Sequence, residues 1–351
     1  NRHNLMTPVS ALLLLLSSLA TYSLLSYLLQ HNSSILVPDR PNTRSLHSQV
    51  VPRGGGIVII VATVSLIAIY QLILESITVL DVLIALLLGC IAVLGWFDDR
   101  RNLTIRSRIF IQVVIACIMV YLLARSQGIH IAGYRLEQPY WLLFIELVVW
   151  VVWMTNLFNF MDGIDGLIAT QSTIATIVLA FWFHQAGAPN LVLLNLTLAG
   201  ALIGFSILNW RPARVFLGDI GSLTLGMYFA VMGIIGWTSY RLPVEAFVLL
   251  YGVVFCDATL TLSARILRRE RWWEAHSSHF YQRLVRLGYN HAQVTLLAVV
   301  ITLCLSIYAT FLIHGFGPQW FWIMLGLVTL AGCGLAVRRK ERARLSQNEE
   351  Q

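Results

Sequence analysis

Apolar residues occur along this chain in long runs that short polar segments separate. Each run is roughly 17 to 25 residues long, which is enough for a helix to cross the hydrocarbon layer of a membrane. We expect eleven membrane spans, at about 5–29, 56–74, 80–97, 109–125, 140–158, 167–184, 191–208, 221–238, 244–264, 294–314 and 319–337. The pattern predicts an all-α, polytopic membrane protein.

Composition supports this prediction. Hydrophobic residues make up 58% of the 351 residues and charged residues 12%, whereas soluble domains carry about 25% charged residues. We expect one integral-membrane domain over residues 1–337, with the first span retained, and a basic tail over 338–351 that is a frayed helix or disordered. The five cysteines lie inside apolar runs and form no close-spaced pair, so they indicate neither a disulfide framework nor a zinc site.

Positive charge is distributed unevenly among the connections. Most of the 24 Lys and Arg residues lie in segments 31–55, 98–108, 209–220, 265–293 and 338–351. The positive-inside rule places these segments in the cytosol, with the N-terminus on the opposite side and the C-terminus cytosolic. Six aspartates lie in or beside the same segments: Asp39, Asp98, Asp99, Asp162, Asp165 and Asp219. We therefore expect the active site on the cytosolic face. The net charge of +7 does not indicate nucleic-acid binding, because the arginines are scattered between the apolar runs rather than gathered on one domain.

The densest polar segment is the short connection at 156–166. An aspartate facing lipid costs roughly 2.5 to 3.5 kcal/mol on insertion scales, and such residues usually mark a functional site. Asn159, Asp162 and Asp165 recur every three residues, so on a helix they would share one face. Carboxylates and amides suit hydrated Mg²⁺ or sugar hydroxyls. The alternative is a pair of helix-capping aspartates.

Asp98 and Asp99 end the third apolar run. Adjacent carboxylates repel each other, and the negative end of a helix dipole is a poor place for them. A divalent cation or nearby arginines would relieve this conflict, and Arg106 and Arg108 follow closely. The alternative is a solvated helix terminus.

Two glycine-containing segments begin later spans. Asp219, in the segment 216–222, is either the N-cap of the eighth span or a metal ligand. Arg53 and the three glycines at 54–56 precede the second span, where exposed backbone N–H groups suit a phosphate. The Lys-Ser/Thr ending of a Walker motif is absent.

His276 and His279 lie in the longest of the basic connections, and their spacing would place them on one helix face. No matching Cys/His pair supports zinc, so we favour oxyanion or diphosphate binding together with neighbouring arginines such as Arg283. The same segment also reads as an interfacial helix with Trp272 and Trp273 at the membrane boundary.

Asp257 is a carboxylate inside the ninth apolar run. We favour a structural role over a catalytic one, with Arg265, two helical turns later, as its expected partner.

Five motifs together resemble a known family: Phe97-Asp98-Asp99, Asn159-Phe-Met-Asp162-Gly-Ile-Asp165-Gly166, Phe216-Leu-Gly-Asp219-Ile-Gly-Ser222, Pro52-Arg53-Gly54-Gly55-Gly56 and His276-Ser-Ser-His279. Their order and spacing are similar to those of the polyprenyl-phosphate N-acetylhexosamine-1-phosphate transferases of glycosyltransferase family 4, which include the MraY and WecA enzymes. The resemblance covers nearly the whole chain. It implies transfer of N-acetylhexosamine 1-phosphate from a UDP-sugar to undecaprenyl phosphate, with release of UMP and with Mg²⁺ as cofactor, for which Mn²⁺ is an expected substitute.

The resemblance also implies roles for individual residues. The catalytic residues are expected to be Asp98, Asp99, Asp219 and His279. The metal ligands are expected to be Asp219, Asp99 and Asp165. Substrate contacts are expected from Asn159, Asp162, Asp165, Phe216, Arg53, His276, Arg108 and Arg283, with Phe216 stacking on uracil.

This sequence differs from the family's usual motifs at two places. The His-Ser-Ser-His variant, in place of three consecutive histidines, is similar to the WbpL-like branch that starts the O-antigen of lipopolysaccharide. Arg108 stands where the family usually has a lysine, so a cation is retained. The resemblance implies a protein of the bacterial inner membrane, with a periplasmic N-terminus. The partners that it implies are an acetamido-sugar nucleotide, undecaprenyl phosphate and the lipid bilayer. A homodimer is compatible with the resemblance.

Two other classes of protein compete with this interpretation. An ion-coupled transporter would place its carboxylates near the middle of the bilayer and would show internal repeats, which this sequence lacks. A CDP-alcohol phosphotransferase would continue its Asp-Gly pair with Ala-Arg, whereas Asp165-Gly166 is followed by 167–170, Leu-Ile-Ala-Thr.

Overall fold

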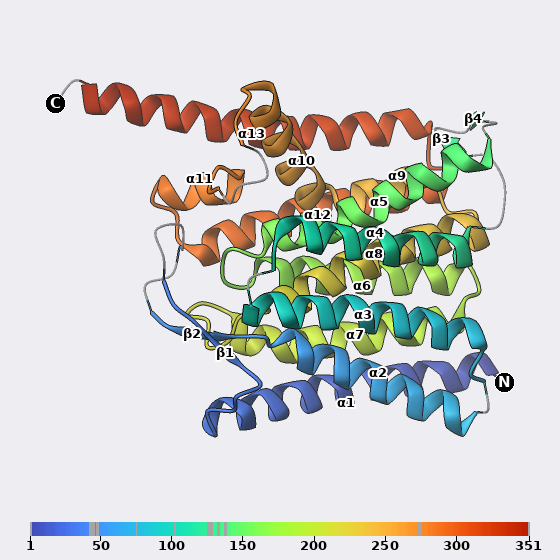
Figure 1. The fold of residues 1–351 in the computed structure, drawn as a ribbon. Coiled ribbons are helices and arrows are strands. Elements are labelled where there is room, and N and C mark those ends of the chain that lie inside the picture. Colours follow the sequence, from blue (N-terminus) through green and yellow to red (C-terminus); the bar gives the residue numbers. More distant parts are fainter. Residues whose placement is uncertain are drawn as a thin grey trace.

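The computed structural model describes residues 2–41, 46, 49–74, 76–101, 103–124, 129–131, 134–136, 139–271 and 276–349. Long helices lie side by side through most of this part of the chain (Figure 1). They are α1 (Arg2–Gln30), α2 (Gly56–Ile73), α3 (Val79–Arg101), α4 (Ile105–Leu123), α5 (Tyr140–Met161), α6 (Leu167–Gln185), α7 (Pro189–Asn209), α8 (Asp219–Tyr240), α12 (His291–Ile313) and α13 (Gln319–Glu349). All ten contain a stretch long and apolar enough to cross a membrane. The prediction of an all-α, polytopic membrane protein is confirmed.

The ninth predicted span is broken. The run at 244–264 forms two helices, α9 (Val244–Leu250) and α10 (Gly252–Leu267), whose axes differ by 82°. Tyr251 lies at the break, and its hydroxyl donates to the main-chain oxygen of Phe229 in α8 at 3.3 Å. A run of apolar residues reports that a segment is buried or faces lipid, but it does not report the direction of the helix axis. The prediction of one continuous ninth span was therefore wrong.

Helix α8 lies at the centre of the bundle. In its most apolar stretch 89% of the residues are buried, compared with 22% for α3 and 11% for α13. It packs against α3 and α5 along its length and also contacts α2, α4, α6 and α9. Since lipid tails are as apolar as the side chains, close packing rather than the hydrophobic effect holds such helices together. Asp219, at the start of α8, therefore lies on the most enclosed of the ten long helices in the described part of the chain.

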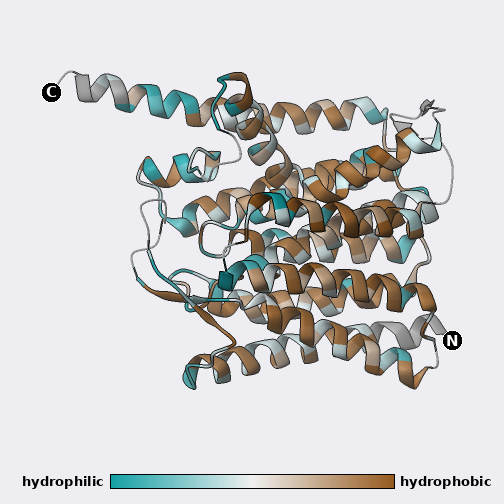
Figure 2. Ribbon diagram, viewed as in Figure 1, coloured by the Kyte–Doolittle hydropathy of each residue, from teal (hydrophilic) through white to brown (hydrophobic). Residues whose placement is uncertain are grey.

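Hydrophilic residues gather at one end of the bundle, which we call the polar end (Figure 2). The hairpin of β1 (Val37–Asp39) and β2 (Val51–Arg53) and the short helix α11 (Phe280–Arg286) lie there, whereas the N-terminus and the hairpin of β3 (Ile129–Ile131) and β4 (Tyr134–Leu136) lie at the opposite end (Figure 1).

The C-terminal segment is more regular than expected. Helix α13 continues through 338 without a break to Glu349. The part of the predicted tail that the structure describes is therefore an extension of the last span, and its end reaches the polar end beside α11 (Figure 1).

Candidate active site

Asp99 joins the end of α3 to the start of α8. Its two carboxylate oxygens accept hydrogen bonds from the backbone N–H groups of Asp219, at 3.1 Å, and Ile220, at 3.2 Å. A carboxylate at this place satisfies backbone donors that have no partner within the helix and opposes the positive end of its dipole. Gly218 is the N-cap residue and Asp219 the first residue of α8, so the prediction of Asp219 as a possible N-cap was wrong. The cap comes from another helix.

Two glycines allow this close approach. A Cβ atom at Gly95 would lie 2.5 Å from the main-chain oxygen of Asp219, so only glycine lets α3 pass so near to α8. Gly218 has φ of +78°, in the left-handed region where glycine is favoured, and a Cβ there would lie 2.7 Å from Oδ2 of Asp99. The sequence thus places the two aspartates together through small residues.

Arginines accompany the aspartate pair. The guanidinium of Arg53, from β2, lies 3.3 Å from Oδ1 of Asp99 and also donates to the main-chain oxygen of Asp99. Arg108, from α4, donates to Oδ2 of Asp98 at 2.8 Å, and the backbone N–H of Leu103 donates to its other oxygen at 2.9 Å. An arginine therefore lies beside each of the two aspartates. The sequence pointed to Arg106 and Arg108, and the structure places Arg108 and Arg53 at the pair.

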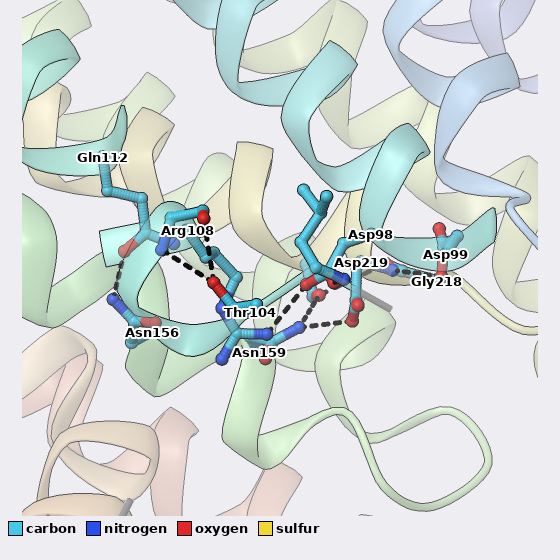
Figure 3. A network of polar contacts seen from close by, with 12 residues as sticks. Asp98, Asp99, Thr104, Arg108, Gln112, Asn156, Asn159, Gly218 and Asp219 are labelled. Atoms are coloured by element: carbon cyan, nitrogen blue, oxygen red, sulfur yellow. Dashed lines mark hydrogen bonds and ion pairs between the residues drawn. The ribbon is translucent and has the colours of Figure 1, made fainter. Parts of the chain in front are cut away.

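Asp219 is held from α5 (Figure 3). The side-chain amide of Asn159 donates to Oδ1 of Asp219 at 2.6 Å and lies 3.0 Å from the hydroxyl of Ser222. One turn earlier on α5, Asn156 donates to the side chain of Gln112 in α4 at 2.6 Å. Amide side chains therefore connect α4, α5 and α8 behind the carboxylates.

Asp162 follows α5 and adds a further carboxylate. Loss of surrounding water raises its pKa well above the ordinary value of 3.8, and the negative charges of Asp219, Asp99 and Asp39 raise it further. Helix α5 ends at Met161, so of the three residues expected on one helix face only Asn159 is helical. That prediction was wrong, because the chain turns at Asp162.

Asp165 lies in a different environment. Its Oδ1 is 3.2 Å from Nδ1 of His291, at the start of α12, and its Oδ2 accepts from the backbone N–H of Ala213 at 3.4 Å. In the part of the chain that the structure describes, no three His, Cys, Asp or Glu side chains are grouped closely enough to hold a metal ion. The structure thus brings together Asp99 and Asp219 of the expected metal ligands, and places Asp165 with His291.

The aromatic residue expected near the nucleotide lies beside the glycine-rich segment. The backbone N–H of Phe216 donates to the oxygen of Pro52 at 2.8 Å, and Phe216 in turn accepts from Gly55 at 2.9 Å. Arg53 and Phe216 form an isolated parallel bridge. These contacts dock the segment before α8 onto β2, so that Arg53, Phe216 and Asp219 share one corner of the polar end.

The histidines are organised by Asp257. Its Oδ1 lies 3.2 Å from Nδ1 of His279 and accepts from the backbone N–H of Phe280 at 2.9 Å, and its Oδ2 accepts from Tyr281 at 3.1 Å. Asp257 therefore caps α11. The expected partner, Arg265, instead pairs with Glu270 at 2.8 Å, so that prediction was wrong.

His276 and His279 do not share a helix face. Residues 276–278 are irregular and His279 is the N-cap of α11, although the two rings are neighbours with centroids 4.9 Å apart. Partial burial, and then the charges of His279 and Arg265, lower the pKa of His276 to about 4. The rings of His279 and Phe160 lie 6.4 Å apart, which brings the histidine pair to the end of α5. Trp272 and Trp273 lie outside the described residues.

Comparison with known proteins agrees with this arrangement. A family model described as glycosyl transferase family 4 matches residues 79–237, which include the two aspartates of α3, the segment after α5 and the start of α8. Residues 79–237 thus match a glycosyl transferase family 4 domain. The family resemblance of the motifs is confirmed.

Relatives in this family extend the match beyond the family model. A Bacillus subtilis (strain 168) protein named probable undecaprenyl-phosphate N-acetylglucosaminyl 1-phosphate transferase is 27% identical over 283 residues, covering 77% of this chain and 76% of the relative. The Salmonella typhi protein named undecaprenyl-phosphate alpha-N-acetylglucosaminyl 1-phosphate transferase is 25% identical and covers 86% and 83%. A Carboxydothermus hydrogenoformans phospho-N-acetylmuramoyl-pentapeptide-transferase is 28% identical and covers 78% and 86%.

Several residues that make contacts at this site were not predicted from the sequence. His291 follows Asn290, and the capping box of Asn290 and Gln293 was a visible sign that a helix begins there. Gln112 was a polar residue inside an apolar run, which is the kind of signal that indicates a buried polar partner. Tyr281 donates from its hydroxyl to the main-chain oxygen of Phe160 at 3.1 Å, and no local pattern indicated that contact.

Proposed function

We propose that this protein transfers an N-acetylhexosamine 1-phosphate group, or a related acetamido-deoxysugar phosphate, from a UDP-sugar to undecaprenyl phosphate. An oxygen of the lipid phosphate attacks the sugar-bearing phosphorus of the UDP-sugar and forms a new P–O bond. The bond between that phosphorus and the bridging oxygen of the phosphoanhydride breaks, and UMP leaves with the bridging oxygen. The products are UMP and a diphosphate-linked lipid sugar.

One observation carries this proposal: at the polar end of the membrane bundle, Asp99 of α3 accepts a hydrogen bond from the backbone N–H of Asp219 in α8, and Asn159 of α5 donates one to the Asp219 carboxylate. The match of residues 79–237 to the family model, and the similarity to relatives whose names state this transfer, support the same reaction. A lipid phosphate lies at the depth of the headgroups and a sugar nucleotide approaches from water, so the end of the bundle is where the two can meet.

Proteins usually hold Mg²⁺ by one or two carboxylates together with water and substrate phosphates, so Mg²⁺ fits Asp99 and Asp219 although no group of three protein ligands is present in the described residues. Asp162, Asp219 and Asp99 offer oxygen ligands of the kind that Mg²⁺ prefers. Burial raises the pKa of Asp162, and the negative charges of Asp219 and Asp99 raise it further. We infer that Asp219 and Asp99 hold the ion, while the neighbouring Asp162 and the more distant Asp165 contact the nucleotide. When bound, the ion would neutralise charge on the phosphates. Phosphoryl transfer otherwise depends on positioning and charge screening, which Arg53 and Arg108 provide at the aspartate pair.

An apolar cavity beside the site suits the lipid substrate. It has a volume of about 670 Å³ and is lined mainly by apolar side chains of α10, α11, α12 and α13. Met161, the residue before Asp162, and Asp257 also line it. An isoprenoid chain in this cavity would have its phosphate near the end of α5.

The cellular setting follows as part of the proposal. The distribution of basic residues favours a cytosolic polar end with the N-terminus periplasmic, in the bacterial inner membrane. The His276-Ser-Ser-His279 motif favours a role in starting the O-antigen of lipopolysaccharide. Both the acceptor and the donor would then be reached from the cytosol.

The test is an assay of the purified full-length protein in detergent. Undecaprenyl phosphate is supplied with a panel of UDP-acetamido sugars, and UMP is measured with and without MgCl₂. We expect UMP to form only when both substrates and Mg²⁺ are present, with equal amounts of diphosphate-linked lipid. Absence of UMP with every sugar of the panel, in a protein that is folded and monodisperse, would refute the proposal.

A further inference from the structure

Helix α11 depends on its neighbours. It has seven residues, and an isolated helix shorter than about 12 residues is marginal in water. Its first turn is fixed by Asp257, which accepts from the backbone N–H groups of Phe280 and Tyr281. Something else must fix its last turn.

The extension of α13 supplies that second attachment. Glu341 accepts two hydrogen bonds from the guanidinium of Arg283, one of them from Nε at 2.6 Å. Arg344 donates to the main-chain oxygen of Arg286 at 2.7 Å. Lys340 donates to the hydroxyl of Tyr289 and lies 4.7 Å from the centre of its ring. These three residues of α13 lie within just over one turn, so they form one contact face against α11 and the turn that follows it.

Arg283 is committed to this contact. Its Nε and one terminal nitrogen bind Glu341 in the two-bonded arrangement that is the strong form of this pair. Its guanidinium also lies 4.7 Å from the centre of the Phe280 ring. The hydrogen bonds to Glu341 raise the pKa of Arg283, so the cation is stabilised in place. We therefore reassign Arg283 from substrate contact to structure.

Helix α11 in turn reaches the reaction site. Its N-cap residue is His279, whose ring faces that of Phe160. Tyr281 donates to the main-chain oxygen of Phe160, and a Cβ atom at Gly163 would lie 2.1 Å from the Tyr281 hydroxyl, so the two segments are in tight contact. A shift of α11 would therefore move His279 and the turn that carries Asp162.

We propose that Glu341 is a positioning residue for the sugar-phosphate transfer: through Arg283 it fixes α11 and so sets the place of His279 relative to the end of α5. This inference rests on the proposed function. It also assigns a use to the C-terminal extension of α13, which is otherwise outside the membrane bundle. The diphosphate of the donor is the substrate part that His279 would meet.

The experiment compares Glu341→Ala, Arg283→Ala and the exchanged pair Arg283→Glu with Glu341→Arg in the full-length protein. Arg342→Ala is the matched control, because Arg342 is an exposed neighbour on the same helix. The first measurement is amide hydrogen exchange over residues 279–287, made without substrates. The second is kcat and KM for UMP release.

In Glu341→Ala we expect exchange over α11 to be about fivefold faster, the factor expected when a partly shielded ion pair is lost. We expect kcat to fall by about the same factor, with KM for the UDP-sugar changed less, because His279 acts on the reacting diphosphate rather than on initial binding. The exchanged pair should recover most of both losses, and the control should match the parent protein.

Unchanged exchange in Glu341→Ala would overturn the attachment of α11 by α13. Faster exchange with unchanged kcat would overturn the positioning role. If the parent protein released no UMP, the proposed function would fall and the positioning role with it, while the exchange data would still decide whether α13 holds α11.

Discussion

The contact between Gly95 of α3 and the start of α8 gives the sharpest test of the site geometry. In Gly95→Ala the new Cβ would lie 2.5 Å from the main-chain oxygen of Asp219 and 2.6 Å from Cα of Ile220, whereas ordinary contact begins at 3.4 Å. The helices must therefore separate by about 1 Å, because atoms in packed interiors do not overlap. The bond from the N–H of Asp219 to Asp99, now 3.1 Å, would lengthen beyond hydrogen-bonding distance.

The expected loss follows from this displacement. A misplacement of about 1 Å near reacting groups costs on the order of 100-fold in rate, and overpacking costs roughly 1 to 3 kcal/mol of stability. UMP release by Gly95→Ala should therefore fall about 100-fold in kcat, with a lower melting temperature.

Gly89→Ala is the matched control. Gly89 lies on the same helix, and a Cβ there would meet no atom within 4 Å. Alanine in place of glycine inside a helix is stabilising by roughly 0.5 to 1 kcal/mol, so this variant should keep full activity. If Gly95→Ala released UMP as fast as Gly89→Ala, the close contact of α3 and α8 would not set the geometry of the aspartates.

Three further predictions concern the carboxylates. Asp219→Asn should lower kcat about 10³-fold or more while the protein stays folded, because one negative oxygen is lost beside the reacting phosphates; near-normal UMP release would exclude Asp219 from the chemistry. EDTA should stop UMP release and added Mg²⁺ should restore it, and activity that persists without any divalent ion would contradict the proposed cofactor. Because the pKa of Asp162 is raised in the folded protein, Asp162 keeps its proton there at pH values where the unfolded chain has lost it, above about pH 4. The stability that this proton contributes is fully present at lower pH and is lost as pH rises towards the folded pKa. In EDTA-treated protein the melting temperature should fall along this range, and Asp162→Asn should flatten the fall; an identical pH dependence in both would exclude Asp162 as its cause.

Hydrophobic runs were sufficient to predict most of the fold. The run at 167–184, for example, coincides with α6, because a helix in lipid must be apolar over the thickness of the membrane. The bend at Tyr251 was not predictable in this way. It depends on contacts with α8, more than twenty positions away in the chain, and the run itself is apolar on both sides of the bend.

The site was only partly readable from the sequence. The electrostatic conflict of Asp98 and Asp99 was visible, and so was its relief by arginine. The backbone N–H groups that bind Asp99 could not be predicted, because they belong to a helix that begins 120 residues later. Spacing rules failed at Asp162 and His276 for the same reason: they assume a helix, and the chain is irregular at both places.

The helices that carry Asp99 and Asp219 differ in what surrounds them. In the most apolar stretch of α8, 89% of the residues are buried within the protein, compared with 22% in α3, so α3 is the more available to lipid. A bilayer that is too thick or too thin acts on lipid-facing helices by tilting them, so it reaches α3 directly and α8 only through its neighbours. We therefore expect membrane thickness to act where Gly95 meets Asp219, so that the rate of transfer would depend on the lipid composition of the membrane.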